Sequence, residues 1–264
     1  MESPSSQFAT AVVIGMGEMG AVFSRALLKA GHIVVPVTRD TDLQAASAAF
    51  PDPDVVLVTV GESDLAEVLA ALPAPWKRRA ALLQNELLPR DWEAHGIVDP
   101  TVAVVWFEKK PGQDVKVIIP SPIGGPYAAR LSAALATIDI PCTVVADADE
   151  LTAELVTKNV YILTVNIGGL TTGGTVADLW DNHRPLAREV ADEVLAIQAW
   201  LAARDLDGDR HIAGMEQAIA GDPEHKATGR SAPARLTRAL HNAAHAGIET
   251  PRLQAIATDH IVDA

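Results

Sequence analysis

The chain has little of what several classes of protein require. Its single cysteine, Cys142, excludes an internal disulfide and a cysteine-based metal site, and its apolar strand-like context predicts an inert core residue. Lys and Arg number 21 against 34 Asp and Glu, so the net charge of −13 argues against a nucleic-acid partner. No apolar run is long enough to span a membrane, and Met1–Ser6 lacks the apolar region of a signal peptide. A cytoplasmic protein without membrane or nucleic-acid partners is expected.

Aromatic residues make up only 4% of the chain, but hydrophobic residues make up 48%, which indicates a globular fold rich in alanine and helix. Strand-like runs alternate with helical patterns through the first half, typical of an α/β doubly wound Rossmann sheet. From Leu151 onward only helical patterns follow, so an all-α C-terminal domain is expected. The predicted divisions are a flexible N-terminus at 1–8, a nucleotide-binding domain at 9–147 and a helical substrate or dimerisation domain at 148–264.

The predicted elements of the first domain can be placed from hydrophobic runs and turn signals. Strands are expected at 11–14, 32–37, 54–60, 80–84, 102–107, 115–119 and 143–145. Helices are expected at 21–30, 43–49, 63–72 and 126–137. Ligands of such sheets bind outside the carboxyl ends of the strands, so the residues that follow the strands are the candidates for a binding site.

The first strand leads directly into a Gly-x-Gly-x-x-Gly motif formed by Gly15, Met16, Gly17, Glu18, Met19 and Gly20. At this spacing Gly15 permits the tight turn, Gly17 lets the backbone approach a pyrophosphate, and Gly20 lets the next helix pack closely. The helix N-terminus then directs its N–H groups at the phosphates. The alternative is a glycine turn that binds nothing. Glu18 is expected to point away, because a carboxylate repels pyrophosphate.

Residues at the ends of the next strands complete the predicted cofactor site: Thr38, Arg39, Thr59, Val60, Gln84 and Asn85. In such sites an acidic residue after the second strand binds the ribose 2′-OH of NAD, whereas an arginine accommodates the 2′-phosphate of NADP. Arg39 stands there and favours NADP(H), although Asp40 follows directly. Arg39 could equally be a solvated loop charge.

Lys158 lies in an apolar helix that spans Leu155–Asn166. Lys158, Ile162 and Asn166 are spaced by four residues and share one face. Polar groups in such a helix need partners, which a cofactor and substrate could supply, but Lys158 could also extend along the helix edge into water. The glycine pairs at 168–169 and 173–174 are expected to break the helix or to allow close approach of a neighbouring helix or subunit.

Other signals are weaker. His241 and His245 are spaced as a metal pair but lack a third ligand, so a solvated helix face is the better interpretation and no metal site is expected. His183 could be a general acid, but its sequence context favours a loop residue. Arg230 or Arg235 could clamp a substrate carboxylate, or could be ordinary surface residues. The Gly- and Pro-containing stretch 221–233 is expected to be a long loop between helices.

Several of these features occur together in one known family. They are the Gly15–Gly20 motif, Ala30-Gly31-His32 before the second strand, Gln84-Asn85 after the fourth, and Lys158 in the first long helix of the second domain. The chain thereby resembles the ketopantoate reductases, which are related to the 6-phosphogluconate dehydrogenase-like proteins, from about Ala9 to Leu253. The resemblance implies a Rossmann domain and a helical domain, with NADPH reducing a 2-oxo acid in the cleft between them.

The resemblance also implies roles for single residues. It makes Lys158 the catalytic proton donor, places Asn85 near nicotinamide and substrate, and assigns Asn166 to substrate binding. Ile162 stands where the family has an asparagine, and Gly61 where it often has a lysine. Around Arg230 and Ser231, which occupy the substrate-contacting region near the C-terminus, no glutamate stands near the expected position.

The sequence therefore leads to three hypotheses. The first is an NADPH-dependent reductase of a small carbonyl or imine compound, forming a homodimer. The second is a catalytically silent NADP(H)-binding sensor or subunit, which the departures at Ile162 and in the C-terminal region motivate. The third is a dehydrogenase that oxidises a hydroxy acid or an amine.

Overall fold

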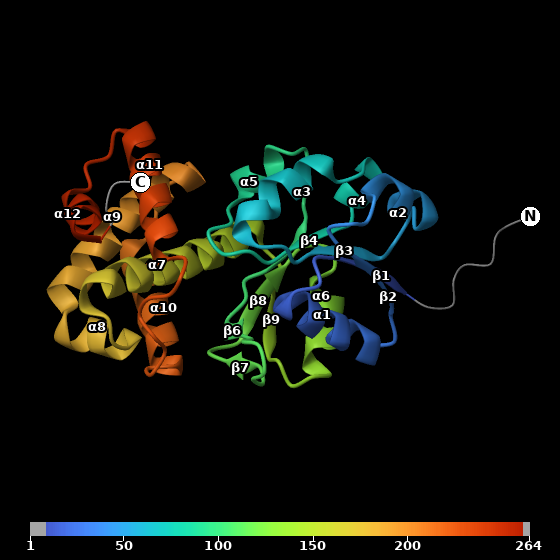
Figure 1. The fold of residues 1–264 in the computed structure, drawn as a ribbon, viewed down its shortest axis with the longest axis horizontal. Coiled ribbons are helices and arrows are strands. Elements are labelled where there is room, and N and C mark those ends of the chain that lie inside the picture. The colour runs from blue at the N-terminus through green and yellow to red at the C-terminus, as the bar shows by residue number, and fades with distance from the viewer. Residues whose placement is uncertain (1–8, 261–264) are drawn as a thin grey trace, which may run out of the picture. The chain divides into compact units, whose positions relative to one another are not determined.

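The computed structural model describes residues 9–260, so the segment 1–8, expected to be flexible, lies outside the described residues. The chain separates into two compact units, Met1–Glu154 and Leu155–Ala264 (Figure 1). The boundary expected from the sequence, at residue 148, is where helix α7 (Ala148–Thr172) begins. The division between the two units falls within that helix, after Glu154.

The first unit contains a seven-stranded sheet of order β2-β1-β3-β4-β5-β8-β9. Its strands are β1 (Thr10–Ile14), β2 (Ile33–Val37), β3 (Val55–Val58), β4 (Ala80–Leu82), β5 (Thr101–Ala103), β8 (Ser121–Gly124) and β9 (Cys142–Val145). Strands β1 to β5 are parallel, whereas β8 pairs antiparallel with β5 and parallel with β9. The predicted doubly wound α/β sheet is confirmed, with its last two strands running against the first five.

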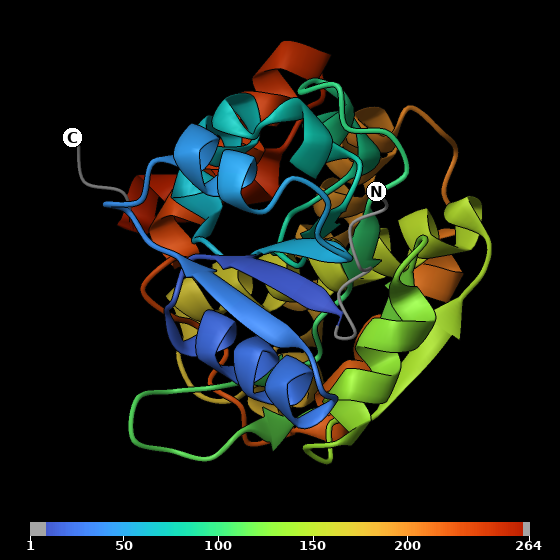
Figure 2. The ribbon, with the colours of Figure 1, turned by 90° about the vertical axis from the view of Figure 1, so that its right-hand side faces the viewer.

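Helices cover both faces of this sheet, which explains why its central strands are apolar on both sides. Helices α1 (Glu18–Lys29) and α6 (Ala128–Ala136) pack on one face, where Phe23, Leu27 and Leu131 join the main hydrophobic core. The other face carries α2 (Leu43–Ala49), α3 (Leu65–Ala71), α4 (Ala74–Lys77) and α5 (Pro89–Glu93) (Figure 1). Figure 2 shows the blue strands β1 and β2 between these two layers of helices. All four residues of β3 are buried.

The region after β5 differs from the prediction. The expected strand 102–107 divides into β5 and β6 (Phe107–Glu108), and the expected strand 115–119 shortens to β7 (Lys116–Val117). Strands β6 and β7 form a separate antiparallel ribbon. The sheet position beside β5 is taken by β8, whose sequence Ser-Pro-Ile-Gly resembles a turn. Backbone pairing with β5 on one side and β9 on the other, which local sequence does not reveal, makes these four buried residues a strand.

Cys142 lies on β9 at the edge of the sheet and is only half-buried, so the expectation of a core position was too strong. Its partial desolvation raises the pKa of the thiol to about 11. The thiol is therefore protonated at neutral pH and a poor nucleophile, in agreement with an inert residue.

The second unit is helical, as predicted. Its helices after α7 are α8 (Val176–Asn182), α9 (Arg184–Ala202), α10 (Gly208–Gly221), α11 (Ala232–Ala246) and α12 (Pro251–His260). Among the described residues after 148, only an isolated bridge between Thr175 and Lys226 has β geometry. Within residues 9–260, no helix combines the length and apolar character needed to cross a membrane.

Helix α7 continues through its first glycine pair and ends before the second. Gly173 follows the helix with φ +64°, a conformation that favours glycine. A Cβ on Gly168 would lie 3.1 Å from Leu179, and one on Gly169 would lie 2.8 Å from Ala227. Of the two alternatives left open by the sequence, the pair at 168–169 serves close packing inside the second unit.

Candidate functional site

The Gly-x-Gly-x-x-Gly motif forms the turn from β1 into α1, as its glycines require. Gly15 has φ +94°, and its N–H donates to the carbonyl of Val37 at 2.9 Å. A Cβ on Gly15 would lie 3.0 Å from Val60, and a Cβ on Gly20 would lie 2.0 Å from the carbonyl oxygen of Gly15. Both glycines are therefore needed for the fold itself, whether or not a ligand binds.

Gly17 is different, because the folded chain gives no reason for it. A Cβ at this position would meet no atom of the surrounding described structure within 4 Å. Gly17 is the N-cap of α1, and no side chain among the described residues caps this helix end. Free N–H groups and an open face at a helix N-terminus together suit an anion such as pyrophosphate.

The motif lies at the switch point of the sheet, where the order in which strands are added reverses, since β2 and β3 lie on opposite sides of β1. Thr59, directly after β3, donates its hydroxyl to the carbonyls of Ile14, at 3.1 Å, and of Gly15. Val60 is half-buried against Gly15. Switch points of this kind are where open α/β sheets bind their ligands. The Thr59 side chain thus holds the start of the glycine loop in place by binding the backbone carbonyls of Ile14 and Gly15.

Thr38, Arg39 and Asp40 form the turn after β2, and all three are exposed. Because Val37 pairs with Ile14, this turn begins beside the glycine loop. The Thr38 N–H donates to the hydroxyl of Thr41 at 3.0 Å. Arg39 and Asp40 thus lie next to each other at the carboxyl end of β2, and both side chains are exposed.

Gln84 and Asn85 follow β4, as predicted, but the protein already engages both amides. Gln84 donates to the carbonyls of Val58, at 2.8 Å, and Val60, at 3.2 Å, and so ties the ends of β3 and β4 together. Asn85 donates to the Glu62 carboxylate at 2.9 Å. Glu62, in the short helix η1 (Glu62–Asp64), was missed by sequence reasoning, although it directly follows Gly61.

Met16 and Met19 differ in their surroundings within the loop. Met16 is 41% exposed and its sulfur accepts weakly from the Ser24 hydroxyl, whereas Met19 packs against the main core. Glu18 is half-exposed, and its carboxylate lies 3.2 Å from the Lys109 ammonium. The Met19 side chain is therefore occupied in the core, and only its backbone is available for a ligand. The Glu18 carboxylate is paired with the Lys109 ammonium.

In the second unit, Lys158 and Asn166 lie two turns apart on α7 and both are buried. Lys158 is 8% exposed, which contradicts a side chain extending into water, and its ammonium lies 5.7 Å from the centre of the Tyr161 ring. Ile162, between Lys158 and Asn166 along the helix, is half-buried. The spacing read from the sequence does place these residues along one helix.

The Asn166 amide is held at both ends. Its oxygen accepts from the Arg235 guanidinium at 2.6 Å, and its nitrogen donates to the Ala227 carbonyl at 3.3 Å. Arg235 is buried, whereas Arg230 and Ser231 are exposed near the end of the connection between α10 and α11. Of the three residues, Arg235 is therefore the one that contacts Asn166 among the described interactions.

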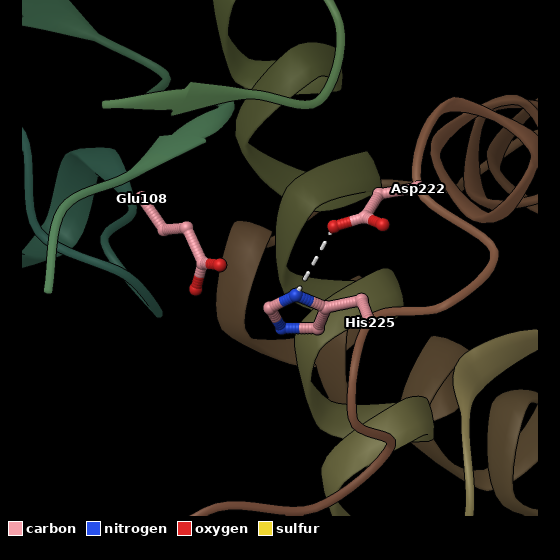
Figure 3. Close-up of side chains that lie close together, drawn as sticks. All are labelled: Glu108, Asp222 and His225. Carbon is pink, nitrogen blue, oxygen red and sulfur yellow. Dashed lines mark ion pairs between the residues drawn. The ribbon is translucent and has the colours of Figure 1, made fainter. Parts of the chain in front are cut away.

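The connection that carries Ala227 is fixed by its own ion pair. Asp222 is buried and its carboxylate lies 3.5 Å from Nδ1 of His225 (Figure 3). The same segment lies against the start of α8, since Val176 donates to the His225 carbonyl at 2.8 Å. The predicted loop at 221–233 is therefore tied to α7 through Ala227 and to α8 through His225.

The remaining histidine candidates lie on helix ends and surfaces. The rings of His241 and His245 pack with their centres 4.2 Å apart and their planes tilted by 51°, and His245 donates from Nδ1 to the His241 carbonyl at 2.9 Å. His183 is the N-cap of α9 and lies 3.9 Å from Asp178. These contacts are ordinary helix-surface and cap interactions.

No protein-family model matches the chain, and no curated protein sequence matches it. Solved structures do match its fold. A PanE/ApbA family ketopantoate reductase from Ralstonia eutropha JMP134 superposes with a TM-score of 0.68 at 17% identity, covering 96% of this chain and 97% of that one. The dimeric ketopantoate reductase from Staphylococcus aureus gives a TM-score of 0.63 at 16% identity over 96% and 97%. D-mandelate dehydrogenase in complex with NADH gives 0.65 at 13% over 96% and 97%.

These likenesses confirm the resemblance to the ketopantoate reductases at the level of the fold.

Proposed function

We propose that the chain is an NADPH-dependent reductase that transfers hydride to a C=O group, as in a 2-oxo acid, or to a C=N group of a small molecule. The observation that carries the proposal is the open face of Gly17 at an uncapped helix N-terminus, at the switch point of the sheet. The fold neighbours, which include ketopantoate reductases and a dehydrogenase solved with NADH, support it.

The bound nicotinamide supplies the hydride, and the chain supplies binding, orientation and a proton. The N–H groups of the loop Gly15–Gly20 hold the pyrophosphate, and Arg39 holds the 2′-phosphate. Asn85, whose amide donates to the Glu62 carboxylate, would lie near the nicotinamide. The order of the strand ends at which these residues lie supports this division of roles.

Lys158 is the proposed proton donor to the developing alkoxide or amine. A positioned proton donor contributes about 10²–10⁴-fold to the rate. Asn166 contributes to substrate binding through Arg235, because its amide oxygen accepts from that guanidinium. Of the two arginines considered, burial beside a neutral amide favours Arg235 over exposed Arg230 as the group that meets a substrate carboxylate.

The experiment that tests the proposal is a turnover assay with NADPH across 2-oxo acids, aldehydes and cyclic imines, run beside the reverse reaction with NADP and hydroxy acids or amines. NADPH oxidation with any carbonyl or imine supports the reductase. Activity only in the reverse panel assigns a dehydrogenase. NADPH binding without turnover in either panel assigns the silent binding protein that Ile162 and the altered C-terminal region suggest.

We also propose that the chain forms a homodimer. The pair Gly168-Gly169 packs inside the second unit, so it no longer argues for a subunit contact. The support is the fold neighbour described as dimeric. Sedimentation velocity on the purified chain distinguishes a dimer from a monomer.

A further inference from the structure

Lys109 reaches the phosphate loop from a part of the chain that sequence reasoning left without a role. It follows β6 in the short ribbon with β7, and its ammonium lies 3.2 Å from the Glu18 carboxylate. The same ammonium donates to the carbonyls of Lys110, at 3.0 Å, and of Gln113. The Lys109 side chain is 21% exposed, against 40% for Glu18. Its position is thus defined by three acceptors in addition to partial burial.

The ribbon is anchored against the helix that carries Glu18. Phe107, two residues before Lys109, is buried in the main core, and its ring centre lies 6.0 Å from that of Phe23 on α1. Val117 on β7 also packs against this core. Lys109 therefore extends from a fixed base, and its contact with Glu18 belongs to the packing of the first unit.

Glu18 is the first residue of α1, directly after Gly17. A carboxylate there is stabilised by the helix dipole, but it occupies the region in which pyrophosphate charge would be held. The Lys109 ammonium cancels this carboxylate where a second anion has to approach.

We propose that Lys109 is a positioning residue for cofactor binding, which acts by neutralising and holding aside the Glu18 carboxylate. The inference rests on the proposed NADPH site. The ammonium does not itself need to touch the pyrophosphate. Removing the ammonium would leave an unpaired negative charge at the phosphate loop, and this charge would lower the affinity for the dinucleotide.

The test is a fluorescence titration of NADPH with the full chain, its K109M variant and the E18Q/K109M double variant. K109M is expected to weaken binding about tenfold at low salt, as one uncancelled charge near the ligand implies, and the loss shrinks as salt is added. The double variant is expected to return to within about twofold of the unaltered chain, because no carboxylate is left to neutralise.

The matched control is K110M. Lys110 is the next residue of the ribbon, pairs with Glu108 at 3.0 Å and is 54% exposed, so its loss changes the net charge equally but leaves Glu18 paired. NADPH affinity should stay within about twofold of the unaltered chain. Equal weakening by K110M and K109M would reduce the effect to net charge and overturn the proposal.

Two further outcomes contradict it. Normal binding by K109M removes Lys109 from the site while the NADPH site stands. A double variant as weak as K109M shows that Lys109 does not act through Glu18. If the unaltered chain binds neither NADPH nor NADH, the proposed function itself fails, and the role of Lys109 fails with it.

Discussion

Lys158 is the residue on which the proposed chemistry depends most. Its side chain is buried on α7 near the Tyr161 ring, so replacement by methionine preserves the length and apolar packing while removing the ammonium. K158M is expected to lower kcat by about 10²–10⁴-fold, because the developing negative charge on the substrate then lacks its proton donor. The dissociation constant for NADPH should hardly change. The measurement is steady-state kinetics with a substrate that the unaltered chain reduces, together with a cofactor titration. Unchanged turnover in K158M would remove this lysine from the mechanism.

His211 makes the stability of the second unit depend on pH. It is 2% exposed and lies 2.8 Å from the Thr157 hydroxyl, and desolvation lowers its pKa from the ordinary 6.5. A folded-state pKa below the unfolded one means that the unfolded chain binds the proton more readily. The stabilising difference is therefore present above pH 6.5 and is lost as the pH falls below it.

This pH dependence can be measured by urea denaturation between pH 7.5 and pH 5. The unaltered chain should lose stability by at most about 1.4 kcal/mol per pH unit from this one group. H211Q should show a shallower dependence, whereas H241Q, a change at an exposed histidine on α11, should match the unaltered chain. Equal slopes for all three proteins would contradict a buried neutral imidazole at this position.

At the scale of single elements, local pattern predicted α1, α2, α3 and α6 and the strands with apolar runs, but it missed the short helices α4 and α5. Val55–Val58 lies within its expected strand, and α2 has the expected bounds. Strand β8 was missed because Ser-Pro-Ile-Gly has turn composition, and only its pairing with β5 and β9 makes it a strand. The ribbon of β6 and β7 was misplaced because two-residue strands leave no periodicity to read.

The contact of α7 with the connection between α10 and α11 depends on one glycine. A Cβ on Gly169 would lie 2.8 Å from both the carbonyl carbon and the Cβ of Ala227, so G169V forces these segments apart. A loss of about 1–3 kcal/mol of unfolding free energy is expected, as for overpacking elsewhere. G208A is the control, because its Cβ would have only ordinary contact with Leu195 at 3.6 Å. Denaturant unfolding of both variants checks this, and equal stability of the two would contradict the packing described.

At the scale of the whole molecule, alternation of strands and helices predicted the fold class, and the fold neighbours agree with it. The pairings that complete the candidate site were not predictable. Glu62 with Asn85, Arg235 with Asn166, and Lys109 with Glu18 join residues far apart in sequence. Each depends on which strand ends or helices the fold brings together, and the sequence carries no local signal of that.

The central claim is that the glycine loop binds a dinucleotide, and Gly17 allows it to be tested without disturbing the fold. Its φ of −74° and ψ of −166° suit valine, and the open face leaves room for the side chain. The measurement is a fluorescence titration of the unaltered chain and of G17V with NADPH and NADH, with a thermal melt of each protein alone. We expect the unaltered chain to bind NADPH more tightly than NADH. We expect G17V to remain folded and to melt only slightly lower, since valine is a poorer N-cap than glycine, but to bind neither. Equal NADPH binding by both proteins would show that the loop does not hold the pyrophosphate and would contradict the account.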